Sequence, residues 1–95
     1  MAAYIYANIE VTDTATYEAY RREVPALIAA HGGRYLVRGG AVEVLEGDAA
    51  ALRQVILVFP DMTTLRGFYD SPEYVRLRAL RQTASHGHLL AIQGV

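Results

Sequence analysis

The stretch from Tyr4 to Val11 constrains the fold more than any other part of the chain. Side chains alternate between the two faces of a β-strand. One face of this stretch is aliphatic and consists of Ile5, Ala7, Ile9 and Val11. The other face is half aromatic and half polar and consists of Tyr4, Tyr6, Asn8 and Glu10. The aliphatic face needs a helix over it, whereas the mixed face suits contact with a partner chain, a ligand or both.

A chain of 95 residues forms a single domain, residues 1–95, near the small end of what buries an adequate core alone. Fifteen of its residues are Ala, which adds little buried area, so seven Tyr and two Phe supply much of the apolar surface. Oligomerisation is therefore expected.

Charge and cysteine content exclude several classes of function. Nine Arg and no Lys balance ten acids without a long run of either sign, which does not favour nucleic acid or an anionic membrane as partner. The lack of Cys excludes disulfides and thiolate chemistry. No apolar run approaches the roughly 20 residues of a membrane span, and the chain starts with a strand pattern instead of a signal peptide. We expect a cytoplasmic protein, and abundant Arg and Ala suggest a GC-rich bacterial genome.

The first helix is predicted over about residues 14–31. Thr12-Asp13 supplies its N-cap oxygen, Pro25 should bend it, and Gly32-Gly33 ends it with one glycine in the left-handed conformation. Its apolar stripe contains Tyr17, Tyr20, Val24, Leu27, Ile28 and His31.

Residues 34–46 are strand-rich on both sides of Gly39-Gly40, which either turn a tight hairpin or kink one long edge strand. We favour the bent strand. A loop over 47–52 then leads to an interior strand over 54–59, which is apolar on both faces.

Two helices and a strand complete the chain. Pro60-Asp61 caps a short helix to about Tyr69, and Ser71-Pro72 starts a second helix, on which Arg76, Arg78 and Arg81 should point mostly outward. The last strand is predicted over 88–93.

This element order, βαββαβ, is the ferredoxin-like arrangement, an α+β fold with helices on one face of an antiparallel sheet. The other face would be left bare. A second copy of the chain, related by a two-fold axis, is the simplest cover, so we expect the chain to be its own partner in a homodimer.

Four stretches carry a family resemblance: Ala-His-Gly-Gly-Arg-Tyr (30–35), Val-Arg-Gly-Gly (37–40), Val-Leu-Glu-Gly-Asp (44–48) and Phe-Tyr-Asp-Ser-Pro-Glu-Tyr (68–74). In these the chain resembles domain-of-unknown-function family 1330. The resemblance implies a dimeric α/β barrel, in which two ferredoxin-like subunits pack sheet to sheet, and it implies no particular activity. Members often carry an aromatic residue after the Gly-Asp pair, where this chain has Ala49; if that aromatic contacts a ligand or the partner, this chain lacks the contact.

Related barrels include cofactor-free monooxygenases, lactone and muconate-type isomerases, haem-handling enzymes and stress-response binders. By analogy of fold alone, the resemblance implies a small apolar or aromatic ligand in the barrel.

The mixed face of the first strand supplies the leading site candidates. Asn8, beside Tyr6, would orient a bound carbonyl or hydroxyl, or it makes a cross-strand hydrogen bond. Arg38 could clamp a ligand carboxylate, or it pairs with Glu43, Glu46 or an acid of the partner chain. Glu46 is included among the candidate ligand contacts.

His31 and Tyr69 complete the candidates. His31 either caps the first helix through the helix dipole or contacts ligand. Tyr69, like Tyr74, either reaches the mouth of the pocket or packs in the core.

His86 and His88 could bind a metal if His31 or a carboxylate joined them, but a pair lacking a third ligand is a weak signal, and a solvated turn is the alternative. We expect neither metal nor cofactor.

The sequence contains no nucleophile elbow, no phosphate loop and no paired carboxylates at a recognisable spacing. Our leading hypothesis is a homodimer whose barrel binds a small, partly apolar molecule. The alternatives are a cofactor-free oxygenase or isomerase, which needs only a shaped apolar cavity and one base, a structural or regulatory dimer with a filled interior, and a metal-dependent enzyme.

Overall fold

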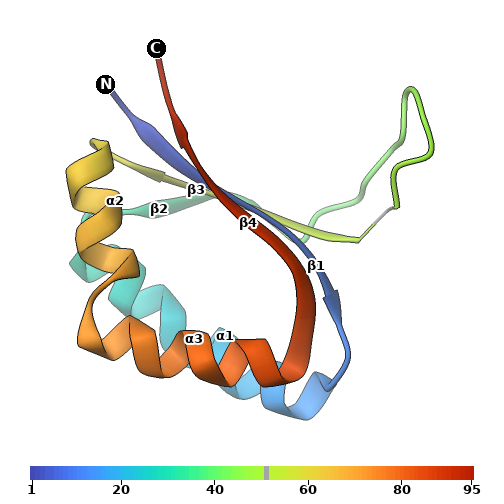
Figure 1. The fold of residues 1–95 in the computed structure, drawn as a ribbon, viewed down its shortest axis with the longest axis horizontal. Helices are drawn as coiled ribbons and strands as arrows, with labels where there is room; N and C mark the ends of the chain where they lie inside the picture. Colours follow the sequence, from blue (N-terminus) through green and yellow to red (C-terminus); the bar gives the residue numbers. More distant parts are fainter. Residues whose placement is uncertain (51) are drawn as a thin grey trace.

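The computed structural model describes residues 1–50 and 52–95. Figure 1 shows seven elements, which are β1 (Ala3–Val11), α1 (Thr14–Ala30), β2 (Arg34–Arg38), β3 (Arg53–Phe59), α2 (Met62–Tyr69), α3 (Pro72–Ala84) and β4 (Ser85–Gln93). Residue 51, which falls in the loop predicted over 47–52, lies outside the described residues. The remaining order matches the predicted sequence of elements.

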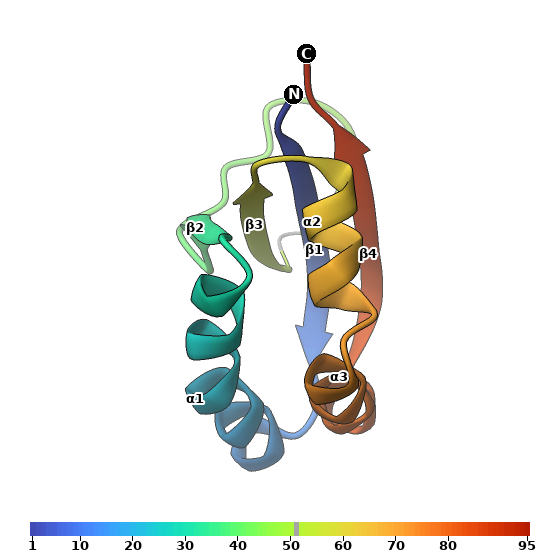
Figure 2. The ribbon, with the colours of Figure 1, turned by 90° about the vertical axis from the view of Figure 1, so that its left-hand side faces the viewer.

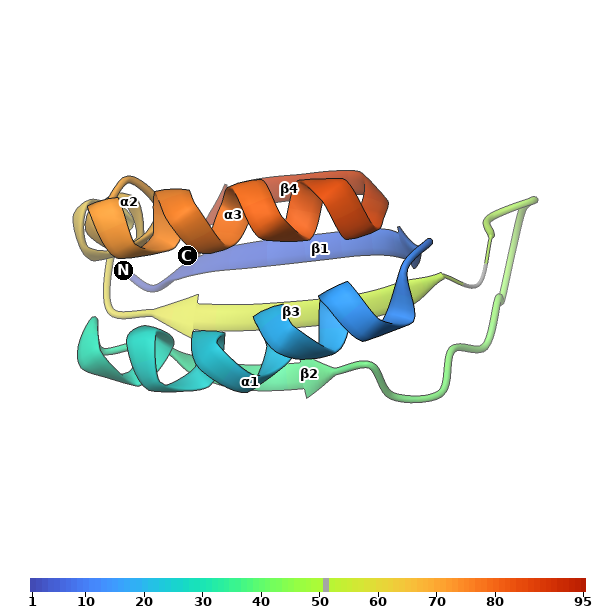
Figure 3. The ribbon, with the colours of Figure 1, turned by 90° about the horizontal axis from the view of Figure 1, so that it is seen from below.

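The four strands form one antiparallel sheet in the order β2-β3-β1-β4. All three helices lie on the same face of this sheet, and α1 and α3 run side by side over it (Figures 2 and 3). This is the ferredoxin-like α+β fold, with β1 inside the sheet as predicted.

Strand β1 has the two unlike faces that its sequence predicts. Its helix-facing side chains are 0–7% exposed and are Ala3, Ile5, Ala7 and Ile9. Removing these side chains from water contributes about 25 cal/mol per Å² of apolar area. The core beneath the helices therefore begins on this strand.

The predicted caps of the three helices are confirmed. The carboxylate of Asp13 accepts a hydrogen bond from the Thr16 amide at 3.1 Å, and that of Asp61 accepts one from the Thr64 amide at 2.7 Å. Ser71 caps α3, with Pro72 in the first turn. At the end of α1, Gly32 takes the left-handed conformation (φ +77°), as predicted for one glycine of the pair.

The long bent strand predicted over residues 34–46 is wrong for the single chain. β2 ends at Arg38, and the following segment leaves the sheet and projects away from the body of the molecule (Figure 1). Strand β2 lies at the sheet edge, so nothing in residues 1–50 and 52–95 pairs with residues 41–46. In this segment Val42, Val44 and Leu45 are exposed.

One further boundary and one side-chain placement differ from the prediction. β4 begins at Ser85 and therefore contains Gly87, whose φ of +145° and close approach to β1 suit a residue without a side chain. On α3, Arg76 is exposed as predicted, but the outward placement of Arg81 is wrong, because this side chain is 7% exposed.

The sheet face opposite the helices is apolar and open. Residues that pair across neighbouring strands point to the same face of the sheet. The apolar residues of this face on β1, β3 and β4 are Tyr4, Tyr6, Ile56, Val58, Leu90 and Ile92. Leu90 and Ile92 are 52% and 45% exposed. We call these six residues the open face. Among the described residues, no helix has the length and apolar character needed to cross a membrane.

Candidate functional site

A cavity of about 40 Å³ lies between the sheet and the helices. Aliphatic side chains of β1 and β3 form the wall of the cavity on the side of the sheet. Tyrosines of α1 and α3 form the wall on the side of the helices. The aromatic residues that line it are Tyr17, Tyr20, Tyr35, Phe68 and Tyr74. A space of this size holds ordered water but no metabolite.

Two open grooves adjoin this cavity along β4. One, of about 200 Å³, lies against α2 and includes Leu65 and Arg66. The other, of about 310 Å³, lies against the end of α3 and the start of β4 and includes Ser85 and His86. Leu89 lines the cavity and both grooves. We call the cavity and its two grooves together the β4 cleft.

Two phenols are joined in the interior of the cleft. The hydroxyl oxygens of Tyr20 and Tyr74 lie 2.9 Å apart, and both side chains are buried. Burial raises the pKa of the Tyr20 phenol well above its ordinary value, and the neighbouring Tyr74 acts in the same direction. Tyr20 is therefore neutral at physiological pH.

Arg81 lines both the cavity and the larger groove. It is buried, and its Nε has no hydrogen-bond partner. Burial acts against the charged form of Arg81, but the phenols of Tyr74, Tyr20 and Tyr69, with a hydrogen bond to Tyr74, outweigh it and raise the pKa of the guanidinium. A buried charge without a counterion is costly to the fold, which makes Arg81 a candidate ligand-binding residue.

Arg53 is a second arginine of the cavity. Its Nε is also buried without a partner, and its guanidinium lies 5.6 Å from the centroid of the Tyr17 ring. The end of this side chain packs against Gly39, where a Cβ would collide with it. Arg53 is therefore held from two sides but has no carboxylate partner within 4 Å among the described residues.

Tyr69 lies at the mouth of the cleft and lines both grooves. The guanidinium of Arg78 lies 4.6 Å from the centroid of its ring, and that of Arg66 lies 5.9 Å away. Its ring also packs on Tyr74 at 5.5 Å between centroids. Of the six candidate residues, Tyr69 is the one that lines the described grooves.

Tyr6 and Asn8 lie on the opposite side of the sheet from the β4 cleft. The Tyr6 hydroxyl donates to Oε1 of Gln54, and Nε2 of Gln54 donates to Oδ1 of Asn8 at 2.6 Å. The cross-strand hydrogen bond considered for Asn8 is thus present. These two candidates form one polar chain with β3 beside the open face.

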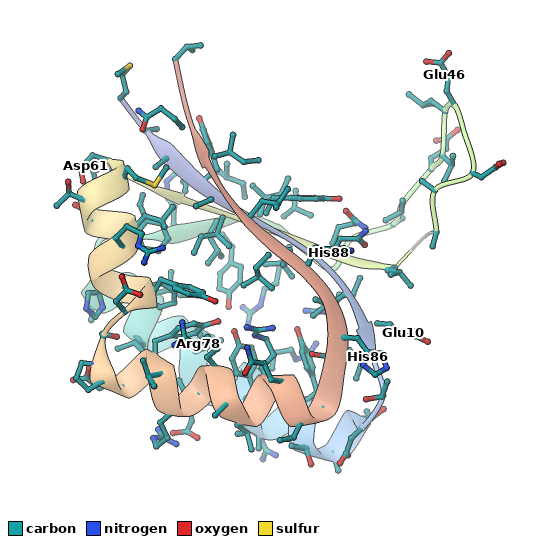
Figure 4. All side chains as sticks on the ribbon, in the orientation of Figure 1. Glu10, Glu46, Asp61, Arg78, His86 and His88 are labelled. Atoms are coloured by element: carbon teal, nitrogen blue, oxygen red, sulfur yellow. The ribbon has the colours of Figure 1, made fainter. Side chains whose placement is uncertain are left out.

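The other three candidates lie apart from that chain and from one another. His31 ends α1, where its Nδ1 lies 3.0 Å from the Leu27 carbonyl oxygen, and its ring packs on Phe68. Arg38 is exposed, and its guanidinium lies 4.5 Å from the centroid of Tyr35, a residue of the cavity. Glu46 is exposed on the projecting segment (Figure 4).

The histidines do not gather into a metal site. Figure 4 shows His86 near Glu10, and the sheet register pairs these two residues, whereas His31 lies at the end of α1. Across residues 1–50 and 52–95, no group of three His, Asp or Glu side chains is arranged to hold a metal ion. The geometry gives no support to the metal-dependent enzyme considered from the sequence.

Sequence reasoning missed Arg53 and Arg81, although a signal was present. Arg81 falls on the buried stripe of α3, three and four residues apart from its neighbours Ala84 and Leu77. Arg53 alternates with Val55, Leu57 and Phe59 on the helix-facing side of β3. Two elements, α3 and β3, each carry an arginine at a position where the pattern predicts a buried apolar residue, and this indicated a site.

Solved structures share the fold along nearly the whole chain. RPA0582, a protein of unknown function from Rhodopseudomonas palustris, is 17% identical with a TM-score of 0.80, covering 99% of this chain and 82% of its own. SnoaB from Streptomyces nogalater, described as a cofactor-independent oxygenase, is 14% identical with a TM-score of 0.69, covering 98% and 92%.

A dimeric ferredoxin-like protein of unknown function from Jannaschia sp. CCS1 is 13% identical with a TM-score of 0.64, covering 100% of this chain and 99% of its own. At such identities the similarity establishes the fold, and the activity of the present chain is unknown. No protein of curated function matches the chain.

The family comparison covers almost every residue. The model of a domain of unknown function, DUF1330, matches residues 2–95. This agrees with the four sequence stretches that carry the resemblance. The chain therefore belongs to the DUF1330 family.

Proposed function

We propose that the chain is a homodimeric protein that binds a small, partly apolar molecule in the β4 cleft. The cleft itself carries this proposal, because a buried aromatic cavity shares lining residues with two grooves of about 200 and 310 Å³. Ligand sites are typically concave and mainly apolar, with a few polar groups that fix orientation. The cavity walls match this description, and the larger groove supplies polar groups from Tyr69, Arg81, Gln82, Ser85 and His86.

In the proposed homodimer, the opposite side of the sheet forms the interface between the two copies. The six apolar residues of the open face would leave water when a second copy packs against them, at about 25 cal/mol per Å². The dimeric ferredoxin-like neighbour supports this arrangement. On this assignment, Tyr6 and Asn8 lie at the dimer interface, and the ligand binds on the helical side of each sheet.

Titration of the isotopically labelled protein with benzoate, benzamide and benzylamine tests the ligand site. We expect at least one of these aromatic probes to shift the backbone amide NMR signals of Tyr69, Arg81 and Leu89. Leu89→Phe should abolish these shifts, because Leu89 lines all three parts of the cleft. Val75→Phe, on an exposed part of α3, is the matched control.

Two outcomes contradict the proposal. Either none of the three probes shifts signals from the cleft, or Leu89→Phe binds the probe as well as the wild-type protein does. Shifts confined to Tyr6, Asn8 and Gln54 would place the ligand on the opposite side of the sheet instead.

A cofactor-free oxygenase is the second candidate. It is favoured by the fold shared with SnoaB and by Arg81, whose buried guanidinium could stabilise negative charge that develops on a substrate oxygen. An oxygen electrode tests this candidate with electron-rich phenols. Oxygen uptake that depends on protein and is lost in Arg81→Gln supports it, and uptake equal to the protein-free blank contradicts it.

A further inference from the structure

Charge is distributed unevenly between the β4 cleft and the rest of the chain. The chain has ten acidic residues and nine arginines. The described lining of the cavity and its grooves contains no Asp or Glu, but it contains five basic side chains: Arg21, Arg53, Arg66, Arg81 and His86. The side chains that line the cleft are thus more basic than the nearly neutral chain as a whole, and the nearest acids lie just outside the lining.

Two of these arginines are neutralised locally. Arg21 pairs with Glu18 at 3.2 Å, and Arg66 pairs with Asp70 at 2.9 Å. Arg53 and Arg81 are not in any ion pair among the described residues. Among the arginines that line the cleft, the two without a carboxylate are the two whose Nε atoms are buried without a hydrogen bond.

The phenols around Arg81 do not replace a counterion. Burial raises the pKa of the Tyr20 phenol well above its ordinary value, so Tyr20 stays protonated at neutral pH. Tyr20 and Tyr74 share a hydrogen bond, with their hydroxyl oxygens 2.9 Å apart, and the Tyr74 hydroxyl also interacts with Arg81 as a neutral group. Leaving a buried charge unpaired costs free energy of folding, and a bound anion would recover this cost.

We propose that the ligand of the β4 cleft is a small aromatic carboxylate whose acid group binds Arg81, with Arg53, which also lines the cavity, adding to the positive potential. This inference rests on the proposed function and narrows it to one chemical class. The planar guanidinium matches a carboxylate with two parallel hydrogen bonds. The cavity of about 40 Å³ has no room for the aromatic ring of the ligand. The ring would lie in the grooves beside Tyr69 and Leu89.

The test compares benzoate with benzamide, which has the same shape and no charge. The Nε–Hε signal of Arg81 should shift with benzoate, and benzamide should bind about tenfold more weakly or worse. Arg81→Gln should lose at least about tenfold in benzoate affinity. Arg76→Gln, which removes an exposed arginine of the same helix paired with Glu23, should bind as the wild type does.

Each other outcome overturns the inference in a distinct way. Equal affinity for benzamide and benzoate, with shifts in the cleft, would support the binding function but contradict the proposal that the ligand is an anion. Tighter binding of inorganic phosphate than of benzoate removes the carboxylate assignment, and unchanged benzoate affinity in Arg81→Gln removes the role of Arg81. Absence of shifts with every aromatic probe removes both the carboxylate and the proposed function. The comparison of probes on the wild-type protein decides the question even if Arg81→Gln does not fold.

Discussion

The hydroxyl oxygens of Tyr20 on α1 and Tyr74 on α3 lie 2.9 Å apart in the interior, where their rings meet edge to face with centroids 6.4 Å apart. This contact joins the two long helices at the cavity of the β4 cleft, which both residues line. The Tyr74 ring continues the aromatic packing to Phe68, 4.5 Å away between centroids. The same residues therefore hold the helices together and form the inner wall of the candidate site.

Removing either hydroxyl should destabilise the fold. Tyr74→Phe leaves the Tyr20 hydroxyl buried without its partner, and we expect a loss of about 1–2 kcal/mol in the free energy of unfolding. The double variant Tyr20→Phe/Tyr74→Phe should cost less than the sum of the single changes, because it leaves no orphan hydroxyl. Urea denaturation measures all three variants. Additive losses would show that the two hydroxyls do not interact in solution.

The raised pKa of Tyr20 predicts a loss of stability at high pH. Below pH 10, the ordinary pKa of the phenol, both folded and unfolded states keep the proton, so this contribution is fully present. Above it the unfolded state releases the proton while the folded state retains it. Stability should then fall with rising pH, by about 1.4 kcal/mol per pH unit from this group.

Tyr20→Phe supplies the comparison for this pH effect, since it removes the titrating group and keeps the ring. Its decline above pH 10 should be shallower than that of the wild type, and below this value the difference between the two proteins should be constant. Urea denaturation at a series of pH values measures both slopes. Identical slopes would mean that Tyr20 is not the group responsible.

Much of the fold could be predicted because its signals are local. Alternation fixed the buried face of β1, and Asp13, Asp61 and Ser71 marked the start of each helix. The second part of the bent strand predicted over 34–46, residues 41–46, does not form, because strand propensity alone does not supply the hydrogen-bonding neighbour that a strand requires. In one chain, β2 is an edge strand and that neighbour is missing.

The site was harder to predict because it depends on which elements pack together. Attention to the mixed face of β1 led to Tyr6 and Asn8, whose polar groups bond to Gln54 on the neighbouring strand. The cleft lies on the other side, where β4 meets α2 and α3, and its position depends on sheet order. Periodicity alone could have shown that Arg81 is on a buried stripe, but not that its guanidinium lacks a carboxylate.

Two Gly→Ala changes should alter stability in opposite directions. At Gly87, with φ +145°, a Cβ would collide with the backbone carbonyl of Asn8 and lie 2.8 Å from the Ile9 Cα, so Gly87→Ala should cost about 3 kcal/mol. Gly67 lies within α2 with open space around it, so Gly67→Ala should gain about 0.5–1 kcal/mol. Thermal unfolding measures both, and a tolerated Gly87→Ala would contradict the close packing of β4 on β1.

A charge on the open face should separate the homodimer into single chains. Leu90 is 52% exposed in the single chain and lies beside Tyr6 across the β1–β4 pair, so a second copy would bury it together with the tyrosines. Leu90→Glu would place an unpaired carboxylate in that interface, at a cost of several kcal/mol.

We expect the wild-type protein to sediment as a dimer and Leu90→Glu as a monomer of 10.5 kDa. Val75→Glu, on the helical side at 42% exposure, should remain dimeric and control for the added charge. A wild-type protein that sediments as a stable, folded monomer at micromolar concentration would show that the open face tolerates water, and the dimer would have to be abandoned while the β4 cleft, formed within one chain, would stand.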